Sequence, residues 1–259
     1  MITVDPSKRT IMLAQMFVPE TPDRPRLFAV LGGRSPGLIA VDRVSSPTWC
    51  FVRCAWSGRV FLSGSPSRTA VIDIIDRFRG AGHVLLDLAD PRVRLYPYRA
   101  AATEHRLEFC SRRSKDPAFT RLLNHMPGGC DVQAIDFESL SACQWKKDLL
   151  YVFGSAERLL QDSLGFGVFC GGVLVSEAHA FFWGGSLVEI GAITKEAYRG
   201  RGYATLAAAH LIAGCEEREY TTYWGCDVEN PASAAVARRL GYGEPRAYTL
   251  EFYPAAEPL

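Results

Sequence analysis

The sequence LVEIGAITKEAYRGRGYATLAAAHLIAGCEE (residues 187–217) is typical of a strand, a basic glycine-rich turn and a helix in succession. Its first eight residues are mainly β-branched and apolar, which favours a strand. After the turn, apolar residues recur at helical spacing at Tyr203, Leu206, Ala207 and Leu211. The turn itself therefore lies where a helix begins.

The turn at residues 199–204 has the composition of a phosphate-binding loop. Backbone N–H groups at a helix N-terminus lack intrahelical partners, and the helix dipole favours negative charge there. Gly200 and Gly202 let the backbone approach a ligand closely, while Arg199 and Arg201 offer charge-assisted hydrogen bonds. We therefore expect the whole turn, including Tyr203 and Ala204, to bind a phosphate or pyrophosphate group.

The same pattern, R-x-x-G-x-[GA], occurs a second time at residues 77–82. That copy follows an apolar helical run, residues 71–78, so Gly80 is predicted to end a helix. Only the copy at residues 199–204 has a strand before it and a helix after it, which is the context that phosphate binding requires.

A second strand and helix follow, at residues 220–227 and 230–242. Asn230 suits the helix N-cap, Pro231 the first helical position and Gly241 the stop. Both elements, in this order and spacing, resemble the GNAT superfamily of acyl-CoA-dependent N-acyltransferases over roughly the last half of the chain. More narrowly, the chain resembles zwittermicin A self-resistance acetyltransferases, in which a similar run D-x-x-N-x-x-S-x-x-L-A-x-x-L-G-Y occurs.

The resemblance implies an α/β (α+β) fold with a mixed, largely antiparallel central sheet flanked by helices. We expect a GNAT N-acyltransferase domain at residues 126–259 and a smaller α/β domain, similar to a degenerate GNAT half, at residues 1–125. Within the smaller domain, short strands are predicted at 27–31, 37–41, 49–55 and 59–62, and a helix at 65–78.

The resemblance also assigns binding roles. In such enzymes the central strands splay apart and pantetheine pairs with the exposed backbone, here that of Ala192, Ile193 and Thr194, where an N–H group could also serve the oxyanion. The amide of Asn230 would hold pantetheine besides capping its helix, and Ser233 could reach the same ligand.

For the general base we favour Glu189, which on an unbulged strand shares a face with Gly191 and Ile193. An exposed or ion-paired strand glutamate is the alternative, and Glu177 is a weaker candidate. Many family members carry a tyrosine as general acid seven residues after the asparagine, and this chain has Ala237 there. Three residues could stand in for it, although a structural role is the stronger interpretation of each: Tyr242, Tyr248 and Cys226.

Composition limits the other classes of function. A chain of 259 residues, 48% hydrophobic with a net charge of +1, predicts a cytoplasmic globular protein without broad attraction to nucleic acid or membrane. Eight cysteines form no C-x-x-C pair, so neither a metal site nor a disulfide is expected.

We therefore predict an N-acyltransferase that moves acetyl, or another acyl group, from its coenzyme A thioester to a primary amine of a small molecule by direct attack. A homodimer is a further expectation. The alternatives are a GNAT-fold enzyme using aminoacyl-tRNA or a carrier-bound acyl donor, and a coenzyme-binding module without catalysis. The local run of basic residues between 105 and 116 could serve RNA, or could be a solvated connection.

Overall fold

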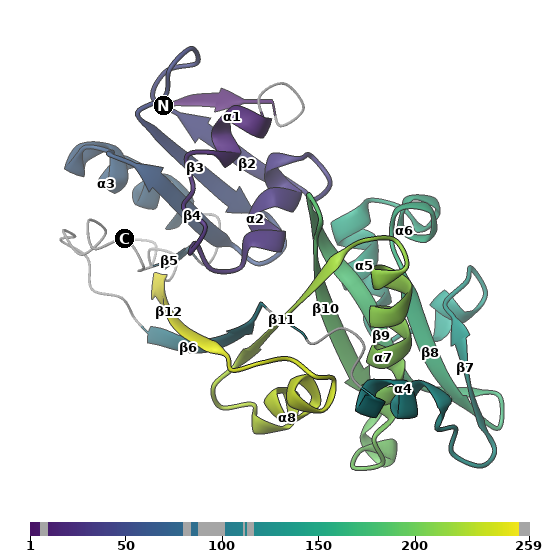
Figure 1. Cartoon of the computed structure of the whole chain (residues 1–259). Helices are drawn as coiled ribbons and strands as arrows, with labels where there is room; N and C mark the ends of the chain where they lie inside the picture. Colours follow the sequence, from purple (N-terminus) through teal and green to yellow (C-terminus); the bar gives the residue numbers. More distant parts are fainter. Residues whose placement is uncertain (6–9, 80–83, 88–101, 111, 113–116, 254–259) are drawn as a thin grey trace, which may run out of the picture. The chain divides into compact units, whose positions relative to one another are not determined.

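A computed structural model describes residues 1–5, 10–79, 84–87, 102–110, 112 and 117–253 (Figure 1). The chain divides into two compact units, Met1–Arg106 with Ala247–Leu259, and Leu107–Arg246. The predicted boundary near residue 125 lies inside the second unit, because helix α4 (Pro117–Asn124) packs against helix α7 (Tyr203–Glu216) of that unit. None of the helices in the described ranges has the length and apolar character needed to cross a bilayer.

The first unit contains a sheet in the order β1-β2-β3-β4-β5-β12. Neighbouring strands are antiparallel except β4 and β5, which are parallel and joined through helix α3. The predicted strands at 37–41, 49–55 and 59–62 are confirmed. The predicted helix at 65–78 also forms, but it begins at Arg68, and the hydroxyl of Ser67 accepts a hydrogen bond from the N–H group of Ala70 at its start. The elements are β1 (Ile2–Val4), α1 (Thr10–Ala14), α2 (Arg24–Leu31), β2 (Gly37–Val41), β3 (Trp49–Cys54), β4 (Arg59–Gly64), α3 (Arg68–Arg79), β5 (Val84–Asp87) and β12 (Arg246–Tyr253).

The predicted strand at 27–31 is wrong, because this segment forms most of helix α2. Pro25 lies in the first turn of the helix, where a missing N–H group costs no hydrogen bond. Leu27, Val30 and Leu31 are fully buried and the helix packs on β2 and β3. A five-residue apolar run fits a strand or a buried helix equally well, and the packing determines which one forms.

The second unit contains the sheet β11-β10-β9-β8-β7. Strands β7 to β10 are antiparallel neighbours and β10 is parallel to β11, so the predicted mixed, largely antiparallel sheet flanked by helices is confirmed. Strand β6 (Ala102–Phe109) spans the boundary between the units in sequence. The remaining elements are β7 (Cys130–Ala134), the 3-10 turn η3 (Ser139–Ala142), α5 (Lys146–Phe153), α6 (Ala156–Asp162), β8 (Gly165–Cys170), β9 (Val173–Gly184), β10 (Leu187–Thr194), the 3-10 turn η4 (Glu196–Tyr198), β11 (Thr221–Asp227) and α8 (Pro231–Arg239).

Helix α7 forms the centre of the core of the second unit. It packs against β8, β9 and β10 (Figure 1), and nine of its residues are buried. Small residues predominate on it, including Ala207, Ala208 and Ala209, which lets the helix lie close to the sheet. The N-terminus of α7, and with it the glycine-rich turn, is thereby fixed relative to the end of β10.

A disulfide joins Cys130 of β7 to Cys170 of β8, which corrects the expectation that no disulfide forms. The two cysteines are 40 residues apart and face each other in the antiparallel register of these strands. Cysteine spacing alone does not reveal such a pair, because strand pairing brings it together.

Candidate active site

The glycine-rich turn begins α7 as the sequence predicts. Gly200 and Gly202 have φ angles of +77° and +82°, and Gly202 is the N-cap of the helix. A Cβ atom at either position would meet no atom within 4 Å, so the backbone conformation, and not crowding, requires glycine there. The turn therefore presents open space beside the first N–H groups of α7.

A cavity of about 680 Å³ lies against this turn. It is formed by Trp145, the end of β10, the turn, the first residues of α7, Trp224 of β11 and one side of α8 along its length. Ten of the predicted binding residues line it: Ala192, Ile193, Thr194, Arg199, Gly200, Gly202, Tyr203, Ala204, Asn230 and Ser233. The structure thus brings together residues from four separate elements.

Arg201 does not line this cavity. Its side chain is exposed, and its guanidinium lies 5.6 Å from the centre of the Tyr198 ring. The Nε atom of Arg199, in contrast, donates a hydrogen bond of 3.3 Å to the carbonyl of Thr194. Arg199 therefore ties the turn to the end of β10, in addition to placing a positive charge at the cavity.

The strands β10 and β11 separate beside the cavity. Their parallel register runs over three pairs, from Leu187 with Thr221 to Glu189 with Tyr223. The following part of β10 remains paired with β9 along its other edge. The backbone of residues 192–194 consequently borders the cavity, as expected for an edge that an extended ligand could join.

Helix α8 completes the cavity. The side chain of Asn230 accepts a hydrogen bond of 3.0 Å from the N–H group of Ser233, as an N-cap should. The Ser233 hydroxyl in turn accepts a hydrogen bond of 3.0 Å from the indole of Trp224, which is buried on β11. Ser233 therefore has a structural partner within the protein.

Asn230 offers a test of its two predicted roles. Asn230→Ala should lower the free energy of unfolding by about 1 kcal/mol, because the N–H group of Ser233 loses its acceptor. Asn230→Asp should restore most of that stability, since a carboxylate also caps the helix, but it removes the amide donor that could hold pantetheine. Chemical denaturation and acetyl-CoA titration of both variants measure the two effects separately. Equal destabilisation by both substitutions would contradict the capping role.

Glu189 lies where the pairing of β10 and β11 ends, and it does not line the cavity. We expected an unbulged strand here, and the register of β10 with β9 shifts between Glu189 and Ile190. The extra residue, Phe181, belongs to β9, so side chains still alternate along β10: Ile190 is buried, whereas Glu189 and Gly191 are half-buried.

A polar network that the sequence did not predict lies next to Glu189. A Cβ atom on Gly225 would lie 3.9 Å from both Glu189 Oε1 and the Tyr223 hydroxyl. That hydroxyl donates a hydrogen bond of 2.6 Å to Glu108, a fully buried residue whose carboxylate also pairs with Arg246. Glu108 and Arg246 come from distant segments, so no local sequence signal reveals the network.

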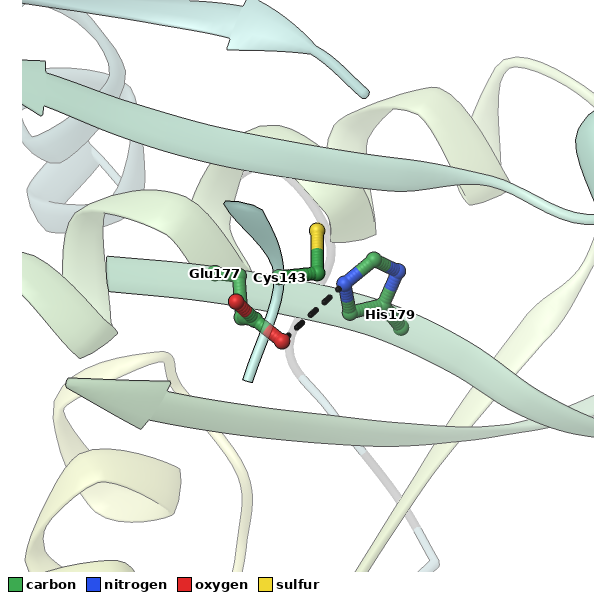
Figure 2. A group of neighbouring side chains, drawn as sticks. All are labelled: Cys143, Glu177 and His179. Atoms are coloured by element: carbon green, nitrogen blue, oxygen red, sulfur yellow. Dashed lines mark ion pairs between the residues drawn. The ribbon is translucent and has the colours of Figure 1, made fainter. Parts of the chain in front are cut away.

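Glu177, the weaker candidate for the base, is fully buried on β9 (Figure 2). Its two oxygens accept hydrogen bonds of 2.9 and 3.0 Å from the N–H groups of Gln144 and Trp145. Burial raises the pKa of this carboxyl, but His179 and the two N–H groups outweigh that effect and the net pKa is lowered. An inaccessible carboxylate with a lowered pKa is a poor proton acceptor, so Glu177 is not suited to be the base.

Ala237 occupies the position at which many family members carry the general-acid tyrosine, and it is fully buried in α8. Of the suggested substitutes, Tyr242 and Cys226 are buried in the second unit, and Tyr248 lies on β12 in the first. Burial raises the pKa of Tyr242, whose hydroxyl donates to Thr222 at 2.7 Å. Neither Tyr242 nor Cys226 lines the cavity.

Further residues, outside the set predicted to bind coenzyme A, also line the cavity. Trp145, at the N-cap of α5, stacks edge-to-face on Phe181 with ring centres 5.0 Å apart. Arg239, in the last turn of α8, adds a positive charge to the lining. Trp145, Trp224 and Arg239 reach the cavity through the tertiary fold, whereas Tyr198 directly precedes the turn in sequence.

The sequence is similar to known acetyltransferases. A family model described as GNAT acetyltransferase matches residues 20–250. An uncharacterized N-acetyltransferase of Bacillus subtilis, YdfB, is 31% identical over 129 residues, which are 49% of this chain and 49% of that protein. The chain thus matches about half the length of this curated relative.

Solved structures resemble the fold over most of the chain. A GCN5-related N-acetyltransferase-like protein from Streptococcus suis has a TM-score of 0.69 at 23% identity, covering 96% of this chain and all of that one. A tandem GNAT protein from the clavulanic acid biosynthesis pathway has a TM-score of 0.61 at 10% identity, covering 99% and 98% of the two chains. At these identities the likeness concerns the fold.

Proposed function

Because the chain belongs to the GNAT acetyltransferase family, we propose that it transfers an acetyl group from acetyl-CoA to the primary amine of a small molecule. The observation that carries the proposal is the cavity of about 680 Å³, which unites the glycine-rich turn, the free edge of β10 and the capped start of α8. Each of these features suits a different part of coenzyme A.

The turn supplies the site for the pyrophosphate. Its N–H groups lie at the start of α7, where unpaired donors and the helix dipole both favour negative charge. Arg199 and Arg239 contribute positive charge from two sides of the lining. The pantetheine arm would then extend along the backbone of residues 192–194 and place the thioester near the point where β10 and β11 separate.

The chemistry needs three contributions from the protein. Glu189, beside the separation of the strands, would accept the proton that the amine loses. A backbone N–H group of Ala192, Ile193 or Thr194 would stabilise the oxyanion. The leaving thiolate needs little assistance, since a thiol has a pKa of about 8.5, and the alanine at position 237 offers no acid.

A ternary complex fits this arrangement better than an acyl-enzyme. Cys215 and Cys226, the two cysteines that follow the turn in sequence, are both buried and do not line the cavity. The amine would therefore attack the thioester directly. The half-buried Trp145 offers an aromatic surface to a small acceptor.

Thiol release measured with a panel of small amines tests this function. We expect release from acetyl-CoA that depends on both enzyme and amine, and an acetylated amine detected by mass spectrometry. Stabilisation by acetyl-CoA without thiol release from any amine would instead support a non-catalytic coenzyme-binding module. Absence of stabilisation, with salt-dependent binding of aminoacyl-tRNA, would support a carrier-dependent enzyme.

A further inference from the structure

Three side chains of types that commonly bind metals lie together beside strand β9, outside the cavity. Cys143 lies between η3 and α5, and Glu177 and His179 lie on β9 (Figure 2). Their potential ligand atoms are all within 4.8 Å of one another. The side chains are buried, with exposed fractions of 7%, 0% and 1% respectively.

The spacing of these atoms suits a bound ion better than a direct hydrogen bond. Within the described part of the chain the buried His179 Nε2 makes no hydrogen bond, and its ion-pair contact with Glu177 Oε1 spans 3.6 Å (Figure 2). A hydrogen bond between nitrogen and oxygen is normally shorter than about 3.2 Å. Two such ligands about 2.0–2.2 Å from a tetrahedral zinc ion are about 3.3–3.6 Å apart. A buried nitrogen without a partner also calls for an explanation.

We propose that Cys143, Glu177 and His179 bind a Zn²⁺ ion. Thiolate, carboxylate and imidazole are the ligand types that zinc prefers. On binding, the Cys143 thiol would release its proton to solvent, so that one thiolate and one carboxylate balance the two positive charges of the ion. The complex would be neutral, which suits a buried position. A water molecule or the Ser139 carbonyl, 3.6 Å from Cys143 Sγ, could complete the coordination.

The position of the site indicates a structural role. None of the three side chains lines the cavity of about 680 Å³. Glu177 already accepts hydrogen bonds from Gln144 and Trp145, and it lies opposite Ile193 in the register of β9 and β10. The ion would therefore link the segment that contains Cys143 and Trp145 to strand β9. Strand β9 pairs with β10, whose residues 192–194 are the proposed pantetheine-binding edge.

Metal content of the whole chain, purified without a histidine tag, tests the site. We expect one Zn²⁺ per chain by elemental analysis, and a thiolate-to-metal absorption band in the near ultraviolet after replacement by Co²⁺. Cys143→Ala and His179→Gln should each remove the band. Cys215→Ala and His210→Gln, which change a buried cysteine and a half-buried histidine of α7, should retain it.

A further variant keeps all three ligands. A Cβ atom on Gly165 would lie 2.6 Å from His179 Nδ1, so Gly165→Ala must displace the imidazole. We expect this substitution to weaken zinc binding at least about tenfold. Zinc at about 100 times its Kd should raise the Tm of the parent by roughly 5–10 °C. A parent that neither binds Co²⁺ with a thiolate band nor is stabilised by zinc would overturn the proposal, as would a Cys143→Ala chain that keeps the band.

Discussion

Replacing Gly202 by valine should weaken acetyl-CoA binding by about 100-fold or more, which corresponds to about 2.7 kcal/mol. Gly202 has a φ angle of +82°, a conformation that costs a β-branched residue on the order of 1–3 kcal/mol. Relaxation of the turn would redirect the N–H groups at the start of α7, and the new side chain would enter space proposed for the pyrophosphate. Calorimetric titration with acetyl-CoA measures the loss.

Gly185, in the turn between β9 and β10, provides the matched control. It has a φ angle of +65°, and a Cβ atom there would also meet nothing within 4 Å, but it does not line the cavity. Gly185→Val should therefore lose a similar amount of stability while binding acetyl-CoA as the parent does. If both variants bind with parental affinity, coenzyme A does not use the turn at residues 199–204.

Glu189→Gln should lower kcat about 10²–10⁴-fold, the usual contribution of a general base. The amide is nearly isosteric with the carboxylate but cannot accept the proton of the amine. Because Glu189 does not line the cavity, the KM for acetyl-CoA should change little. Steady-state rates with a saturating amine, measured across pH, separate the two parameters.

Glu217→Gln is the corresponding control, since it removes an exposed carboxylate at the C-terminus of α7. It should leave both parameters near those of the parent. Undiminished turnover of Glu189→Gln at every pH would exclude this residue as the base. Tyr223, hydrogen-bonded to Glu108, would then be the next residue to test by Tyr223→Phe.

The features predicted correctly from sequence are those with local causes. The turn at residues 199–204 follows from two glycines that adopt positive φ angles, and the start of α8 follows from Asn230 and Pro231. In both cases neighbouring residues determine the backbone conformation. The helix formed by residues 27–31 could not be recognised in the same way, because its burial against β2 and β3 is what favours it over a strand.

The features missed depend on strand register. Cys130 and Cys170 meet because β7 and β8 pair in one alignment, and a shift by one residue would turn their side chains to opposite faces. Glu108 reaches Tyr223 across 115 residues of sequence. Cys143 lies more than thirty residues before Glu177 in the sequence. A search for spacing patterns between cysteines could not have found this contact, because its second residue is a glutamate.

The discontinuous first unit affects how the chain can fold during synthesis. Strand β12 pairs with β5 of that unit. In the sequence, however, the whole of the second unit lies between these two strands. On the ribosome, all of residues 107–245 are translated before β12 emerges. The part of the first unit that is translated earlier must therefore wait for β12, its last strand, to pair with β5. By then the second unit, which carries the glycine-rich turn, is already complete in sequence.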